Sequence, residues 1–125
     1  MTDVSEEIAE AADLLDRAAD VILEHGWHQG GLWPCHTSPD WAQGKPVCAV
    51  GALCVAMDWT ALQQTTFLAD HPRYVRALDA LMKRLRFSNY LDITIWNDQD
   101  CRTGEQVTDA LRDSAKALRE KAGAS

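Results

Sequence analysis

The 125-residue sequence lacks several features that would assign it to a familiar class. It has no run of about 18 apolar residues, the length that a membrane-spanning helix needs. Its first residues, MTDVSEEIAEAADLL, are acidic where a secretory or transit peptide is basic. Its four cysteines form no C-x-x-C pair, and without an export signal their even number does not imply disulfides. We therefore expect a cytoplasmic protein with free thiols and no membrane segment.

Basic residues are scarce, but only in one part of the chain. The formal net charge is −7, and residues 1–25 carry eight acids against one base, whereas the eleven acids and eleven bases from residue 26 onward cancel. Recognition of nucleic acid would need a broad basic surface, so we expect no nucleic-acid partner. The length and the 46% apolar content suit one hydrophobic core. We therefore predict a single domain over residues 1–125.

Apolar residues recur at helical spacing and predict a mainly α protein, a compact bundle of four or five helices. The longest predicted helix covers about residues 3–25, with Gly26 as its stop. Further helices are predicted at about 47–57, 60–68, 72–86 and 103–122, and the last begins at a capping box of Thr103 and Gln106. The side chains predicted to face the core are Ile8, Ala12, Leu15, Ala19 and Ile22 in the first helix, Val75, Leu78, Met82 and Leu85 in the fourth, and Val107, Leu111, Ala115 and Leu118 in the last.

Two segments do not have a helical pattern. Residues 27–46 hold three of the five tryptophans and three of the four prolines, so we expect a long Trp-rich loop there. Residues 91–98 are rich in β-forming side chains and predict a short extended segment. The loop is its natural partner, so the fold contains at most a short two-stranded β element.

Cys48 is the residue with the most chemical interest. On a helix, Cys48 shares one face with Gly51, Ala52 and Val55, and small residues on one face allow another element to approach closely. The alternative is a nucleophile, because Pro46 places Cys48 in the first turn, where the helix dipole and free amides lower the pKa of a thiol. We favour packing and keep the alternative of a cysteine-dependent hydrolase or acyl transferase.

The enzyme hypothesis also needs a base and a group to orient it. The candidates for these roles are His71, His36, Asn97 and Asp98, and His28 serves the scheme equally well. Cys35, His36, Cys48 and Cys101 are residue types that bind zinc, but they lack the usual close ligand pairs. We therefore expect neither a metal nor another cofactor.

Two groups of residues are candidates for binding a partner or ligand. Asn97 and Asp98 either bond the backbone of a turn beside Trp96 or line a polar pocket with the loop tryptophans, which are Trp27, Trp33 and Trp41. The acids of the first helix form a stripe that is either solvated or a partner site, and they are Glu6, Glu10, Asp13, Asp20 and Glu24. The basic side of helix 72–86 can pair with this stripe within the bundle or between subunits, which keeps a homo-oligomer open.

Four motifs occur in one order along the chain: GW-x-x-G at 26–30, C-x-x-GAL at 48–53, WND at 96–98 and RT-x-x-x-V at 102–107. In these motifs the chain resembles a family of uncharacterised actinobacterial and actinophage proteins. The resemblance implies one intact domain of bacterial or phage origin. It also favours a packing role for Cys48 and the WND turn, because the motifs include none of the histidines and no other cysteine.

Together these observations predict a small cytoplasmic binding protein rather than an enzyme. Its partner is expected to be another protein, bound through the acidic helix or the Trp-rich loop. For a phage product, that partner would be a host protein.

Overall fold

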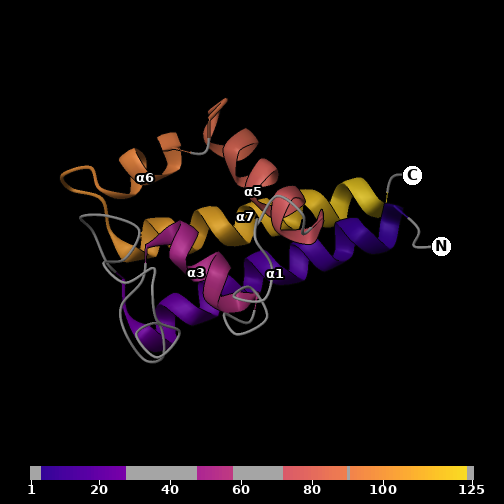
Figure 1. Cartoon of the computed structure of the whole chain (residues 1–125), viewed down its shortest axis with the longest axis horizontal. Coiled ribbons are helices and arrows are strands. Elements are labelled where there is room, and N and C mark those ends of the chain that lie inside the picture. The colour runs from indigo at the N-terminus through magenta and orange to yellow at the C-terminus, as the bar shows by residue number, and fades with distance from the viewer. Residues whose placement is uncertain (1–3, 28–47, 58–71, 90, 124–125) are drawn as a thin grey trace.

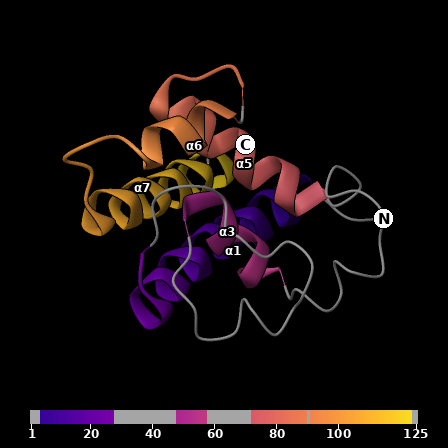
Figure 2. The ribbon, with the colours of Figure 1, turned by 60° about the vertical axis from the view of Figure 1, so that its left-hand side comes forward.

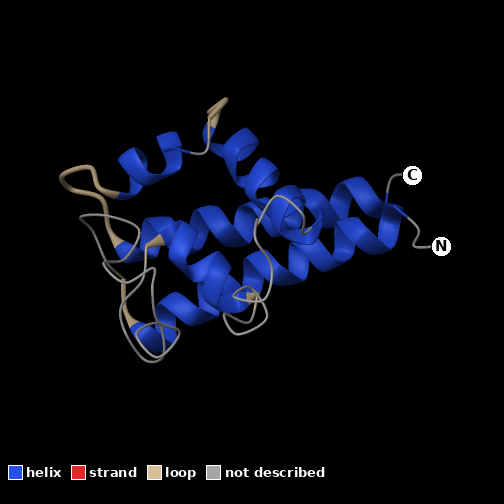
Figure 3. Cartoon of the chain, in the orientation of Figure 1, coloured by secondary structure: helices blue, strands red, loops and turns tan. Residues whose placement is uncertain are grey.

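The computed structural model describes residues 4–27, 48–57, 72–89 and 91–123, and the regular elements within these ranges are all helices (Figure 3). They are α1 (Val4–His25), α3 (Ala49–Ala56), α5 (Pro72–Leu85), α6 (Leu91–Asn97) and α7 (Gly104–Gly123). The prediction of a mainly α bundle is confirmed. The predicted helix at 60–68 and nearly all of the Trp-rich loop lie outside the described residues.

The two long helices, α1 and α7, lie side by side and antiparallel, with the start of α1 and the end of α7 at the same end of the molecule (Figures 1 and 2). α3 and α5 both pack on this pair, and α6 contacts α3. The predicted core faces of α1 and α7 are confirmed, because Leu15 and Leu111 are fully buried and their neighbours on the same stripes are buried or partly buried. Full burial of one such side chain contributes about 2 kcal/mol to folding.

The ends of two helices follow the local signals in the sequence. Gly26 ends α1 in the left-handed conformation (φ 99°), and its amide donates to the Ile22 carbonyl at 2.8 Å. At the start of α7, the Thr103 amide donates to the Gln106 side chain, and the Gln106 amide donates to the Thr103 hydroxyl, both at 3.1 Å. The predicted capping box is therefore confirmed.

The core-facing stripe of α5 lies one residue away from the predicted one. Tyr74, Ala77 and Leu81 are buried, whereas Val75, which was predicted to face the core, is 42% exposed. Tyr74 and Ala77 extend the buried stripe at the spacing of one helical face, and an aromatic ring fills more of the core than the Val75 side chain would. The prediction for Val75 was wrong, and Leu78, Met82 and Leu85 are only partly buried.

The prediction of an extended segment at 91–98 was also wrong, because residues 91–97 form α6. Ile93 and Asn97 are both fully buried and lie one helical turn apart, so one face of α6 packs inward. Ile95, on another side of the helix, is 62% exposed. The preference of β-branched residues for strands is weak, and packing against α3 outweighs it here.

Candidate functional site

Asn97 joins three elements at one end of the bundle. Its side chain is 0% exposed, and its Oδ1 accepts hydrogen bonds from the Trp27 Nε1–H at 2.8 Å and from the Ala49 amide at 3.2 Å. Its Nδ2 donates to Asp98 Oδ1 at 3.0 Å. Ala49 is the first residue of α3, whose amide has no partner within its own helix, so Asn97 caps α3 from a distance. The WND turn therefore holds α3 and the end of α1 together.

Arg102 holds the segment that leads from α6 to α7. Its Nε donates to the Trp96 carbonyl at 3.0 Å, and its guanidinium lies 4.4 Å from the centre of the Trp96 ring, within the range of a cation–π contact. Its remaining nitrogens donate to Gln99 at 2.6 Å and to Gln106 at 3.3 Å. These contacts fix the connection to the capping box at Thr103.

Gly104 brings the start of α7 against the end of α1. A β-carbon at this position would lie 3.1 Å from the Trp27 Cβ, closer than side chains normally approach, so glycine permits the contact. Trp27 and Gly104 also line an open surface depression with Leu23 and Glu105. Residues of all four sequence motifs thus meet at this end of the bundle, and they bond mainly to one another.

Cys48 lies directly before α3, and its carbonyl accepts the hydrogen bond from the Ala52 amide at 2.8 Å. Its side chain is 1% exposed, within the core cluster that includes Ala49 and Ala52. A nucleophile must reach its substrate, so this burial supports packing. Its proposed partners His36 and His71 lie outside the described residues, as do Cys35, His28, Trp33 and Trp41. Of the tryptophans that were candidates for binding, Trp27 and Trp96 are partly buried in the cluster around Asn97.

Two of the five acids predicted for a partner site form ion pairs that connect α1 to α7. Arg119 pairs with Asp13 at 2.9 Å and also with Asp16, and Arg112 pairs with Asp20 at 2.8 Å. The hydrogen bonds that Arg119 donates to Asp16 and then to Asp13 raise the pKa of its guanidinium. The other three acids are exposed and form no ion pair with a described residue, and they are Glu6, Glu10 and Glu24.

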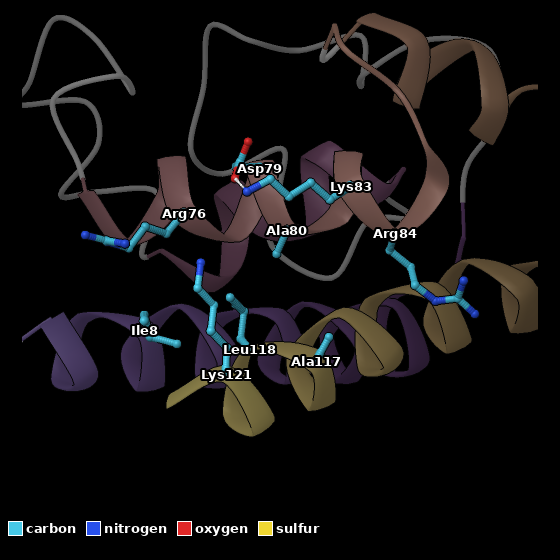
Figure 4. Close-up of a pocket in the computed structure, with 9 residues that line it drawn as sticks. All are labelled: Ile8, Arg76, Asp79, Ala80, Lys83, Arg84, Ala117, Leu118 and Lys121. Carbon is cyan, nitrogen blue, oxygen red and sulfur yellow. Dashed lines mark ion pairs between the residues drawn. The ribbon is translucent and has the colours of Figure 1, made fainter. Parts of the chain in front are cut away.

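A groove lies between α5 and the paired helices α1 and α7, on the other side of the α7 core stripe from Arg112 and Arg119 (Figure 4). Its volume is about 310 Å³. The apolar part of its lining comes from all three helices, and consists of Ile8, Ala80, Ala117 and Leu118. The groove therefore offers an apolar floor that begins at the core and opens to solvent.

The rim of this groove is mostly basic. Four of the residues that line it are cations, namely Arg76, Lys83, Arg84 and Lys121, and one is an acid, Asp79. Arg76 pairs with Glu7 at 2.9 Å, Lys83 with Asp79 at 3.0 Å and Arg84 with Asp113 at 3.2 Å. Lys121 forms no ion pair with a described residue, and Figure 4 shows it extending from α7 toward α5.

Sequence reasoning did not identify the groove as a site. The signal was present in the basic side of helix 72–86, which was interpreted only as a partner for the acidic helix. Arg76 does meet Glu7 of α1, but most of the acids of α1 that are ion-paired meet α7. The three rim cations of α5 are each paired with one acid, so Lys121 is the lining cation without an ion pair to a described residue. Only the tertiary arrangement places Lys121 and the apolar floor beside the basic residues of α5.

The described part of the chain offers no cluster of metal ligands. No three His, Cys, Asp or Glu side chains in the described ranges lie close enough together to hold a metal ion. Among the same residues, no helix combines the length and the apolar character needed to cross a bilayer. Cys48 and Cys101 are free thiols, the first buried and the second exposed.

Comparison with known proteins places most of the chain in one family. Residues 7–117 match a family of unknown function, DUF6197. No curated protein and no solved structure matches the chain. The match begins within α1 and ends at Ala117 in α7, so it includes the cluster around Asn97 and most of the groove lining, but not Leu118 or Lys121.

Proposed function

We propose that this chain, which belongs to the DUF6197 family, is a small non-enzymatic binding domain that engages a protein partner through the groove between α1, α5 and α7. The observation that carries the proposal is the combination of an apolar floor with a rim of four cations, of which two form exposed ion pairs and Lys121 forms none with a described residue. Protein interfaces commonly combine an apolar centre with a polar rim. This groove has both.

The polar cluster around Asn97 also supports a non-enzymatic role, because its side chains are bonded to one another. Asn97 is buried, and its Oδ1 accepts from both Trp27 and Ala49. Arg102 is bonded to Trp96, Gln99 and Gln106. A reacting substrate would have to displace these contacts, which hold the helices together. We therefore assign this cluster to stability and the groove to binding.

The setting of this binding follows from the sequence. The resemblance to actinobacterial and actinophage proteins leads us to propose a bacterial or phage origin. For a phage product the partner would be a host protein, and the cytoplasm is where we expect the two to meet.

Site-specific photo-crosslinking tests the proposal. A photoreactive residue at Ala117, which lines the groove, is compared with one at Lys116, which is exposed on another side of α7. Both variants are expressed in the cells that carry the gene, and crosslinked peptides are identified by mass spectrometry. We expect Ala117 to crosslink a defined segment of one protein, and Lys116 not to do so.

The crosslinked protein is then purified and its binding is measured directly. Lys121→Glu should weaken this binding, whereas Lys116→Glu, which changes the net charge equally, should not. Equal crosslinking from both positions, or none from Ala117, would contradict the proposed function.

A further inference from the structure

We infer that the occupant of the groove is an acidic amphipathic helix of the partner protein, a short helix with apolar residues on one side and carboxylates beside them. This inference rests on the proposed function and specifies the chemistry of the partner. Binding of an amphipathic helix in an apolar groove is a common mode of recognition, in which residues at i, i+3 or i+4 and i+7 anchor the helix.

The shape of the groove fits such a helix. On α5 the lining runs from Arg76 through Ala80 to Arg84, which spans roughly 12 Å of helix, or about two turns. On α7 the facing edge runs from Ala117 to Lys121. Ala80 and Ala117 are small, so a third backbone can approach between the two helices. Apolar side chains of the occupant would then reach Ile8 and Leu118.

The positive charge of the groove favours an occupant with negative charge. The groove lining holds four cations and one acid, Asp79, and the partners of Arg76 and Arg84 add two acids, so one positive charge is in excess at the groove of a chain whose net charge is −7. In the figure, Arg76 and Arg84 point to opposite ends of the groove, and Lys121 extends across it toward α5 (Figure 4). Carboxylates on both sides of an amphipathic helix would meet these three cations. A basic helix would place like charges against them.

The ion pairs already present do not prevent carboxylates of the occupant from binding these cations. The Lys83 and Asp79 side chains are 71% and 51% exposed, and the Arg84 pair is exposed to a similar degree. Exposed ion pairs contribute about 0–1 kcal/mol each, so an incoming carboxylate can replace one at little cost. Lys121 forms no ion pair with a described residue, and it is the cation that we expect to contribute most.

The extent of the basic surface favours a protein segment over a nucleic acid or a membrane surface. The groove is about two helical turns long, and Glu7, Asp79 and Asp113 lie among its cations. A nucleic acid or an anionic bilayer is a continuous array of negative charge and gains affinity from many cations acting together. A helix that carries a few carboxylates around an apolar stripe needs only the cations present here.

A designed peptide tests the inference without knowledge of the partner. The probe is a fluorescent peptide of about 15 residues with leucine at i, i+4, i+7 and i+11 and glutamate at the flanking positions. One control peptide has lysine in place of every glutamate. A second has the same composition as the probe in a scrambled order without an amphipathic face. Binding to the full chain is measured by fluorescence anisotropy, and the bound surface is located by NMR chemical-shift changes.

We expect the acidic amphipathic peptide to bind at least about tenfold more tightly than either control peptide, with shift changes at Ala80 and Ala117. Lys121→Glu should weaken this binding by about tenfold or more, and Lys116→Glu should change it less than about twofold. Raising the salt concentration should weaken it as well, because the rim charges are exposed.

Several results would overturn the inference. These are equal binding of the acidic and basic peptides, no binding of the acidic peptide, or shift changes away from the groove. Recruitment of the chain to anionic vesicles but not to the peptide would assign the groove to a membrane surface. Crosslinking of Ala117 to a second copy of the chain would assign it to self-association. If Ala117 instead crosslinks a partner segment without acids, the inference fails while the proposed function stands.

Discussion

The cluster around Asn97 and the groove beside α5 both concentrate polar side chains, but they differ in how these side chains are used. Asn97 is fully buried, and its bonds to Trp27 and Ala49 join α1, α3 and α6. Among the cations of the groove, Lys83 and Arg84 are exposed and pair with exposed acids, whereas Arg76 and its partner Glu7 are partly buried. Buried hydrogen bonds are costly to break, whereas exposed ion pairs exchange readily.

This difference separates what holds the fold from what can bind. Most of the described motif residues are buried or partly buried, so we expect them to matter first for the fold. The groove is lined by common surface residues that form no motif. The four predictions that follow test this division, beginning with the largest expected effect.

Cys48 should be protected from alkylation in the folded protein, whereas Cys101 should react at once. Cys48 is 1% exposed and Cys101 is exposed, so Cys48 reacts only through opening of the structure. For an opening free energy of about 4 kcal/mol, its rate should be roughly 1,000-fold lower. Mass spectrometry of iodoacetamide-treated protein measures both rates. Rapid labelling of native Cys48, faster at a pH well below 8.5, would support the cysteine-dependent enzyme instead.

Asn97→Ala should lower the free energy of unfolding by about 2–4 kcal/mol. The substitution leaves the buried Ala49 amide and the Trp27 indole N–H without their acceptor and opens a small cavity. Chemical denaturation measures the loss. The control is Gln99→Ala, which removes the exposed bond to Arg102 and should cost less than about 1 kcal/mol. Equal losses in the two variants would contradict the distinction between buried and exposed polar groups.

Local signals in the sequence were sufficient to predict most of the fold. The apolar stripes of α1 and α7, the stop at Gly26 and the capping box at Thr103 depend on neighbouring residues, and the structure contains all of them. The predictions were wrong where contacts between residues distant in the sequence determine the local structure. α6 is a helix because Ile93 and Asn97 pack inward, and the face of α5 depends on which side chain fills the core best.

The candidate site was harder to predict for the same reason. The WND turn was a candidate for either a structural or a binding role, but the hydrogen bonds that Asn97 accepts from the distant residues Trp27 and Ala49 leave no trace in local spacing. The groove needs α1, α5 and α7 together, and Ile8, Ala80 and Leu118 come from separate helices. No periodicity within one segment can show that these residues face the same space.

Gly104→Ala should destabilise the protein by about 1 kcal/mol, although alanine favours helices over glycine by about that amount. The added carbon would lie 3.1 Å from the Trp27 Cβ, and the bond from the Trp27 indole to Asn97 limits how far this side chain can move. Overpacking of this kind typically costs about 1–3 kcal/mol. Thermal denaturation of this variant is compared with Asp109→Ala, an exposed change on the same helix. If Gly104→Ala is instead stabilising, the contact is not tight.

The ion pairs between α1 and α7 should contribute the least to the free energy of unfolding. Arg119→Ala should cost at most about 1 kcal/mol, because its side chain and that of Asp13 are exposed. A double-mutant cycle of Arg119→Ala with Asp16→Ala measures the coupling, and the Lys83–Asp79 pair, with its i, i+4 spacing, serves as a control expected at about 0.3–0.5 kcal/mol.

Salt, rather than deprotonation of Arg119, should control this coupling. A pKa raised in the folded state gives stability that is complete below the unfolded pKa and is lost only as the pH rises through the folded value. For a guanidinium that loss lies above the pH at which proteins are handled, so Arg119 stays charged. About 1 M salt reduces the Debye length to about 3 Å and should remove most of the coupling. A coupling above about 2 kcal/mol that persists in about 1 M salt would mean that these pairs hold the bundle together as the Asn97 cluster does.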